Sequence, residues 1–503
     1  MKFSSCFLLA IVLLMIALLP QVAMSNNIQV TTPVLTGQNT GTHYTQVQFT
    51  VTWDNSWRDV VNWDAAWVFV KYKGNDGIWK HATLSATGSD HTAPAGSTIT
   101  PSSDGKGVFI YRSTNGSGSN SFANAKLHWN YGTDGVGDND LITVKVFAVE
   151  MVYVPQASFY VGDGATNNEI GQFVAGSGTS PFQITGEGQL TLGGGGVGSL
   201  GNNNPGNMYV PDDFNSSTSQ TLPASFPKGY NAFYCMKYEI SQGQYADFLN
   251  TLTGTQASNR FPNGNGWRHT ISVSGSVYSA SRPDRACNFL SCRDDAAYAD
   301  WSALRPMTEM EFEKACRGDQ SPVANEYAWG TTNITAADAI SGTEDGTETI
   351  TTTNANCCFN NTTFSGGDGG LGPLRCGIFA KNTTTREQAG ASYYGVMEMS
   401  GNLWERLVCV GNSTGRSFTG AHGDGALDGS GDANVSNWPG TNAVGTGYRG
   451  GSCDDASSNI SHLRTSDREY AGEWTTSRGT DTGFRCVRTD PAGPTTLPPA
   501  TRR

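Results

Sequence analysis

Cysteine is the side chain with the most reactive chemistry in this sequence, and its distribution is uneven. Ten of the eleven cysteines lie between Cys235 and Cys486, and the remaining one, Cys6, lies in an apolar run near the N-terminus. An even number of cysteines in an exported chain is compatible with disulfide bonds. The spacings do not form two CxxC pairs, which argues against a zinc site of that type.

Histidines and nucleophiles give no further catalytic pattern. Beyond residue 150 the chain has three histidines, His269, His422 and His462, and their spacing shows no close pair of the kind that would favour a non-haem iron site. No spacing assigns a Ser-His-Asp triad or a pair of glycosidase carboxylates. The glycine-rich stretch at 193–198 lacks the GxxxxGK[ST] pattern of a phosphate-binding loop.

Carboxylates in turn-rich sequence are the other group with clear chemistry. Glu398 and Glu405 flank the segment Met-Ser-Gly-Asn-Leu-Trp, and Asp368 begins an Asp-Gly-Gly turn. Carboxylate and carbonyl oxygens are the ligands that Ca²⁺ prefers. The alternative is that these carboxylates only cap turns in a region with little regular secondary structure.

Composition limits the class of protein. At 503 residues the chain is long enough for two domains, which is the division we expect. The net charge of −12 and the absence of any basic run argue against a nucleic-acid-binding surface, because such a surface needs clustered Lys and Arg. Charged residues make up only 15% of the chain and glycine contributes 62 residues, a balance typical of loop-rich extracellular folds.

The N-terminus predicts export. Lys2 precedes an apolar run at 7–19, and small residues at Ala23 and Ser25 suit a cleavage site, so residues 1–25 are predicted to be a signal peptide. The alternative is a membrane anchor, but the run is shorter than the roughly 20 apolar residues that span a bilayer. No later segment is apolar enough to be a transmembrane segment. We therefore expect a secreted or periplasmic protein.

Residues 27–150 have the pattern of half-buried strands. Val47, Phe49, Val51 and Trp53 alternate with polar residues, which places one face in a core and the other in water. Further strand-like runs are separated by clusters of Gly, Asn, Asp and Ser, and a β-sandwich is the simplest architecture. Tryptophans in this region could line a carbohydrate platform, but packing is their more frequent role and no site is predicted here.

Residues 151–490 are predicted to form a second, loop-rich domain, so that the fold class is α+β. The Gly, Asn, Ser and Thr content of residues 165–228 predicts an insertion loop, and residues 491–503 are predicted to be a disordered tail. Ser241 is predicted to cap one helix, and Thr308 with Glu311 forms the capping box of another.

Several separated motifs in this second part resemble the formylglycine-generating enzyme (sulfatase-modifying factor) family. They lie, in order, at residues 151–162, 233–241, 304–318, 327–330, 397–406, 448–452 and 483–486. The resemblance implies a variant of the C-type lectin fold. It also implies the activity of that family, in which copper and oxygen convert a cysteine of sulfatases to formylglycine.

The resemblance further implies two calcium sites. In the first, the matching ligands are the side chains of Glu398 and Glu405 with the carbonyl oxygens of Gly401 and Leu403. In the second, Asn356 and the carbonyl oxygen of Cys357 combine with Asp368 and the carbonyl oxygen of Gly370. Calcium is thus an expected cofactor.

The sequence departs from the family at the catalytic positions. Active members place two cysteines three and eight positions after a Gly-Gly-Ser motif, and here those positions hold Asp455 and Ile460. Cu(I) needs soft thiolate ligands, so copper is not expected to bind as it does in the family. Ser452 is retained, with Cys453 beside it.

Two functions remain open from the sequence. The first is a calcium-stabilised binding module without oxidase activity, whose cleft around Ser452, Cys453, Asp455 and Arg468 takes a peptide, protein or carbohydrate ligand. The second is a formylglycine-generating oxidase with an active site relocated to Cys453.

Overall fold

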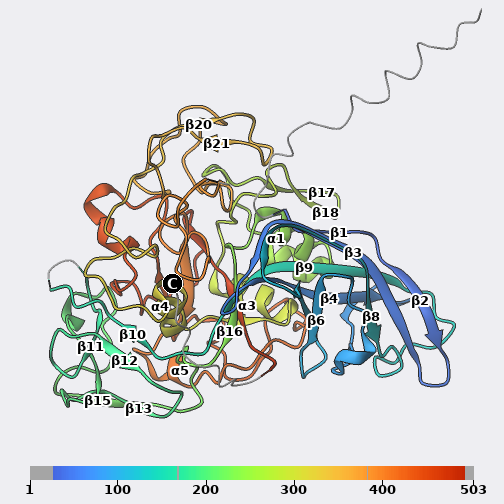
Figure 1. Cartoon of the computed structure of the whole chain (residues 1–503), viewed down its shortest axis with the longest axis horizontal. Coiled ribbons are helices and arrows are strands. Elements are labelled where there is room, and N and C mark those ends of the chain that lie inside the picture. The colour runs from blue at the N-terminus through green and yellow to red at the C-terminus, as the bar shows by residue number, and fades with distance from the viewer. Residues whose placement is uncertain (1–26, 167–168, 382, 493–503) are drawn as a thin grey trace, which may run out of the picture.

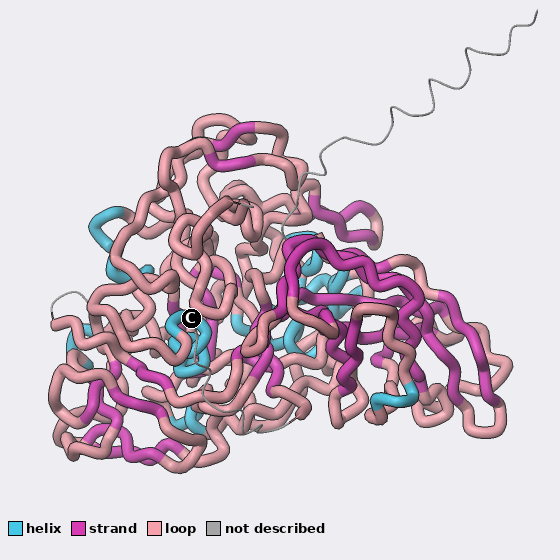
Figure 2. The backbone as a smooth tube through the Cα atoms, in the orientation of Figure 1, coloured by secondary structure: helices cyan, strands magenta, loops and turns pink. Residues whose placement is uncertain are grey.

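The computed structural model describes residues 27–166, 169–381 and 383–492 (Figure 1). The predicted signal peptide and all but the first two residues of the predicted tail lie outside these ranges. Strands and loops dominate the fold, and the few helices are short (Figure 2). No helix within the described ranges is both long and apolar enough to cross a membrane.

The N-terminal part consists of β-strands in two sheets. The first sheet contains β1 (Gln29–Val30), β2 (Val34–Asn39), β3 (Tyr44–Arg58) and β8 (Gly116–Trp129). The alternation predicted for residues 47–53 is confirmed, because every second side chain of β3 from Thr45 to Trp53 is buried. These side chains meet those of Ala66, Val68 and Val70 from the second sheet in one apolar cluster.

The second sheet extends through both parts of the molecule. Its strand order is β19-β25-β16-β9-β4-β7-β6, with β5 beside β4. The strands are β4 (Asp64–Lys73), β5 (Trp79–His81), β6 (Ser97–Pro101), β7 (Val108–Arg112), β9 (Thr143–Val154), β16 (Phe233–Met236), β19 (Arg305–Pro306) and β25 (Cys486–Thr489).

Strand β9 runs through residue 150, where the sequence suggested a domain boundary. Along its length it pairs with β4 of the N-terminal part, and at its end it pairs with β16 of the C-terminal part. Across the junction, the indole Nε1 of Trp67 donates to the Ser302 carbonyl at 2.9 Å and the Lys71 ammonium donates to the Gly425 carbonyl at 2.8 Å. The two parts therefore share a sheet and buried polar contacts.

Residues 165–228, which the sequence suggested to be an insertion loop, contain a small sheet with strand order β11-β14-β13-β15. Its strands are β11 (Phe173–Ala175), β13 (Leu190–Gly193), β14 (Leu200–Asn202) and β15 (Ser219–Leu222), and nearby β12 (Phe182–Ile184) pairs with β10 (Phe159–Val161). Phe173, Leu192 and Leu200 are buried in the main apolar cluster. Scattered apolar residues thus order a segment that its composition did not predict to be ordered.

Short helices and strands complete the C-terminal part. The helices are α1 (Gln242–Leu249), α2 (Gly254–Arg260), α3 (Cys292–Trp301), α4 (Glu309–Arg317) and α5 (Ser413–Arg416). The predicted caps are confirmed, because Ser241 and Thr308 each form a capping box. The remaining strands are β17 (Ile271–Ser274), β18 (Val277–Ala280), β20 (Ile340–Ser341), β21 (Thr349–Ile350), β22 (Trp404–Val408), β23 (Thr446–Arg449) and β24 (Thr482–Gly483).

Candidate functional site

A pocket of about 360 Å³ lies at the end of the three-stranded sheet β23-β22-β24. Trp404 of β22, Tyr448 of β23 and Tyr470 supply aromatic walls. The loop that follows β23, which includes the 3₁₀ helix Ser457–Leu463, forms the opposite rim. This pocket contains Ser452 and Asp455, two of the four residues that the sequence placed in a cleft.

A chain of hydrogen bonds runs along one wall of the pocket. Asp455 accepts from the Ser452 backbone N–H at 2.7 Å through Oδ2, and its Oδ1 lies 2.5 Å from His462 Nδ1. The other ring nitrogen, Nε2 of His462, lies 3.0 Å from Glu469 Oε2. The Ser452 hydroxyl interacts with Asp455 and with Asp481 Oδ2 at 3.2 Å. The imidazole of His462 bonds to carboxylates and not to the Ser452 hydroxyl. These hydrogen bonds therefore do not form the pair of serine nucleophile and histidine base found in a catalytic triad.

The charge of the pocket is mainly negative. Besides Asp455, it is lined by Asp454, Asp481 and Glu473. Burial, followed by repulsion from Asp454, raises the pKa of Asp481 to about 6. Oδ1 of Asp454 is buried and has no hydrogen-bond partner in the structure. The pocket is therefore rich in oxygen acceptors that a ligand with N–H or O–H donors could use.

Cys453 points away from this pocket. Its side chain is 2% exposed and packs with Cys358, Leu374 and Ile378 in a separate apolar cluster. Burial, with repulsion from neighbouring groups, raises the pKa of this free thiol well above its usual value. A thiol in such surroundings is a poor source of the thiolate that copper binding and nucleophilic attack require.

The two positions at which the resemblance implies cysteines in active members have different surroundings from each other. Asp455 lines the pocket, whereas Ile460 packs against an apolar cluster that includes Tyr327 and Leu463. Asp455 is also committed to Ser452 and His462 through hydrogen bonds. These two side chains thus offer neither a pair of donors nor any sulfur to a soft metal ion.

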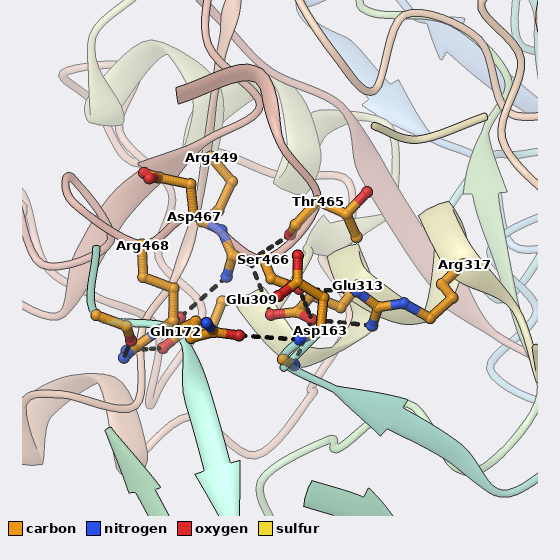
Figure 3. A network of polar contacts seen from close by, with 12 residues as sticks. Asp163, Gln172, Glu309, Glu313, Arg317, Arg449, Thr465, Ser466, Asp467 and Arg468 are labelled. Atoms are coloured by element: carbon orange, nitrogen blue, oxygen red, sulfur yellow. Dashed lines mark hydrogen bonds and ion pairs between the residues drawn. The ribbon is translucent and has the colours of Figure 1, made fainter. Parts of the chain in front are cut away.

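Arg468 is not part of the pocket but of a buried ion-pair network on α4 (Figure 3). Its guanidinium lies 2.7 Å from Glu309 and 2.8 Å from Asp212, and it covers the ring of Phe173. The sequence placed Arg468 in the cleft because residues 464–468 resemble a strand near the cleft of the family. The structure shows it fully buried and holding that loop in place.

The same network fixes the other end of the loop. Arg449, the last residue of β23, contacts Glu309 at 3.3 Å and Glu313 at 2.8 Å. Glu313 also pairs with Arg317, which in turn contacts Glu326 and donates to the Ser466 hydroxyl. Residues 450–463, which carry the rim of the pocket, are therefore anchored to α4 at both ends.

The first expected calcium set fits a cation in part. Glu239, Glu398 and Glu405 are buried carboxylates whose charges repel one another, and Arg485 holds both oxygens of Glu405 at 2.7 Å. Oε1 of Glu398 accepts from the Gly377 N–H, while its Oε2 is buried without a partner. Burial raises the pKa of Glu398 to about 7. A cation near Glu398 would relieve this excess of negative charge.

The second expected calcium set does not fit. Arg268 and Arg285 each contact Asp368 at 2.7 Å, so two positive charges already occupy the place of a cation. The side-chain oxygen of Asn356 accepts from the Thr335 N–H, and its amide nitrogen donates to backbone carbonyls. The Cys357 and Gly370 carbonyls already accept other backbone N–H groups. Within the described part of the chain, no group of three or more His, Cys, Asp or Glu is arranged around a common metal position.

Several residues of the pocket could not be found from the sequence. His462 was noted only as a histidine without a partner, and Asp481 drew no attention. Their roles depend on Asp455 and Ser452, which are brought to them by the fold and not by a fixed spacing. Trp404 and Tyr448 lie within the family motifs, and this position was the one feature of the sequence that could have marked them as pocket residues.

The contacts of His462 predict an unusual titration. Burial alone would lower the pKa of His462, but the hydrogen bond to Asp455 and the charges of Asp455, Asp467 and Glu469 outweigh it and raise the pKa to about 9. Since the folded-state pKa is above the unfolded value of about 6.5, the stabilisation is complete below that pH and is lost as the pH rises through about 9. NMR titration of the imidazole should show this pKa, and Asp455→Asn should lower it. A wild-type value at or below 6.5 would contradict the geometry.

Comparison with known proteins agrees with the motifs. The model of the sulfatase-modifying factor enzyme 1-like domain matches residues 195–490, more than half of the chain. A comparison with curated proteins gave no match. The matched range includes the pocket, α4 and most of the ion-pair network. The chain therefore belongs to the family of proteins with a sulfatase-modifying factor enzyme 1-like domain.

Proposed function

We propose that this protein is an exported binding module of the sulfatase-modifying factor family that does not oxidise cysteine. The observation that carries the proposal is the state of the two catalytic positions. Asp455 is bonded to Ser452 and His462, and Ile460 is packed in an apolar cluster. Linear Cu(I) coordination by two thiolates has no equivalent at these positions.

The ligand is inferred from the walls of the pocket. Carboxylates of Asp454, Asp455 and Asp481 supply acceptors, and Trp404 and Tyr470 supply aromatic faces. Hydroxyl and amino groups of a ligand would donate to the carboxylates, and its apolar faces would pack on the rings. A peptide or a carbohydrate has these properties, and a pocket of about 360 Å³ is within the usual range for such ligands.

Calcium is proposed as a stabilising ion at the first set only. Glu398, with its unpaired Oε2, and the carbonyl oxygens of Gly401 and Leu403 would hold the ion. Glu405 would become a calcium ligand only if it gave up its ion pair with Arg485. Bound calcium would neutralise part of the buried negative charge in this region.

The proposal predicts no formylglycine formation. The copper-loaded protein, incubated with oxygen and a sulfatase-motif peptide that carries the target cysteine, should leave the mass of that peptide unchanged. A variant with both family cysteines restored, Asp455→Cys with Ile460→Cys, tests whether the assay detects a copper-thiolate centre in this fold. Conversion of the peptide by the wild-type protein that is lost in Cys453→Ser would establish the relocated oxidase instead.

Calcium removal provides an independent prediction. Because an ion that binds only the folded state stabilises it, EGTA should lower the melting temperature of the purified protein, and added calcium should restore it. Glu398→Gln keeps the size of the side chain and should reduce the response to EGTA. Asp368→Asn, in the set that does not fit, serves as the matched control and should leave the response intact. An identical melting temperature with and without EGTA would contradict the calcium proposal.

A further inference from the structure

A groove of about 570 Å³, larger than the pocket around Asp455, shares no lining residue with that pocket. Its lining residues come from the region of β1, from β9 and from α1, three elements that Figure 1 labels close together, and β9 supplies the floor. Ile28 and Val30 form one apolar wall, and Gly243, Gln244 and Asp247 of α1 form the other. Neither the family motifs nor the proposed ligand pocket accounts for this groove.

The floor of the groove is an open strand edge. On one side, β9 pairs with β4 from Thr143 to Val152. On the other side, β16 pairs only with residues 151–154, and the last contact is the Lys237 N–H donating to the Glu150 carbonyl. The chain then leaves the sheet because Ser241 starts α1. The place of a neighbouring strand along residues 143–149 is therefore vacant in the sheet.

The direction of the backbone groups follows from this register. Backbone N–H and C=O groups of successive strand residues point to opposite edges, and the Glu150 carbonyl points to the β16 edge. The N–H and C=O groups of Val144, Val146 and Ala148 hence point into the groove. No hydrogen bond between described residues engages them on that edge. Unpaired backbone groups at strand spacing form a template for one more strand.

Charge narrows the class of ligand. Asp247 and Asp284 line the groove, and no hydrogen bond or ion pair to another described residue is found for either carboxylate. Burial raises the pKa of both, and the opposite charges that lower it act at longer range: Lys145 of β9, whose ammonium lies over the ring of Trp79, acts on Asp247, and Arg375 acts on Asp284. The groove thus combines apolar walls, unpaired backbone groups and two carboxylates that no basic side chain contacts directly.

We propose that this groove binds an extended peptide segment of a partner protein, which adds to the free edge of β9 as a strand and brings a Lys or Arg side chain toward Asp247 or Asp284. Val144, Val146 and Ala148 would exchange backbone hydrogen bonds with the peptide. Alternate apolar side chains would pack on the wall formed by Ile28 and Val30.

Other occupants fit the groove less well. A second copy cannot bring its own β9 edge into contact, because that edge is recessed between β1 and α1 in each copy. The C-terminal sequence after residue 492 contains Pro494, Pro498 and Pro499, which lack the N–H groups that a ladder needs. The groove requires backbone N–H groups that can pair with β9 and a positive charge near Asp247 or Asp284. A partner segment that has few prolines and carries a basic residue supplies both.

The test uses hydrogen exchange and a fluorescein-labelled probe peptide, acetyl-Lys-Val-Thr-Val-Thr-Val-amide. Binding should raise the fluorescence polarisation and slow the exchange of the amides of Val144, Val146 and Ala148. The same peptide with alternate backbone N-methyl groups, which cannot donate along one edge, should bind about tenfold more weakly or worse. Replacement of the peptide Lys by Glu should also weaken binding.

Protein variants separate this site from the other pocket. Asp247→Asn with Asp284→Asn keeps the groove and removes its charge, so it should weaken the Lys peptide but not a peptide with Gln in that position. Asp455→Ala alters the other pocket and should leave the probe affinity unchanged. The proposal is overturned if the N-methylated peptide binds equally well, or if the three amides exchange as rapidly with the probe as without it. Strong protection of these amides before any peptide is added would also overturn it, because the edge would then be occupied already.

Discussion

Two carboxylates one turn apart on α4 organise the loop-rich half of this protein. Glu309 and Glu313 meet Arg317 of the same helix and Arg449 and Arg468, which lie on either side of the pocket loop (Figure 3). All of these side chains are buried, so each charge lost its hydration on folding and depends on its partners for compensation. Removal of any partner would leave an uncompensated charge, which is why such a network specifies one arrangement of the loops around it.

The network also explains how a site can exist with so little regular secondary structure. Arg449 ends β23 immediately before the loop with Ser452 and Asp455, and residues 465–468 follow that loop. With both ends of the loop held on α4, the pocket rim is positioned without a long helix or strand. The hydrogen bond that Asp455 accepts from His462 and the one that it accepts from the Ser452 N–H then fix the interior of the loop.

Local features were predictable from the sequence, and long-range ones were not. The alternation in β3 and the capping boxes at Ser241 and Thr308 depend on neighbouring residues, and both were confirmed. The passage of β9 through residue 150 depends on pairing with β16, more than 80 residues later, which no local pattern reveals. The ordered small sheet within residues 165–228 likewise depends on burial against the main core, whereas its composition suggested a loop.

The same division applies to the site. The absence of cysteine at positions 455 and 460, which hold Asp and Ile, could be recognised from the motif alone. The burial of Cys453, the contact of Asp455 with His462 and the structural role of Arg468 could not, because they depend on residues that the fold brings together. The two arginines beside Asp368 show in addition that a matching carboxylate need not have a matching environment.

We infer that this member of the family has no thiolate site for Cu(I) in its pocket. A competitive titration of the reduced protein against a colorimetric Cu(I) chelator tests it most directly, with Cys453→Ser titrated in parallel. We expect the two proteins to take equally little Cu(I) from the chelator, because Cys453 is buried in a separate apolar cluster and Asp455 and Ile460 supply no sulfur. One tightly held Cu(I) per wild-type molecule that is lost in Cys453→Ser would instead show that Cys453 forms a copper site.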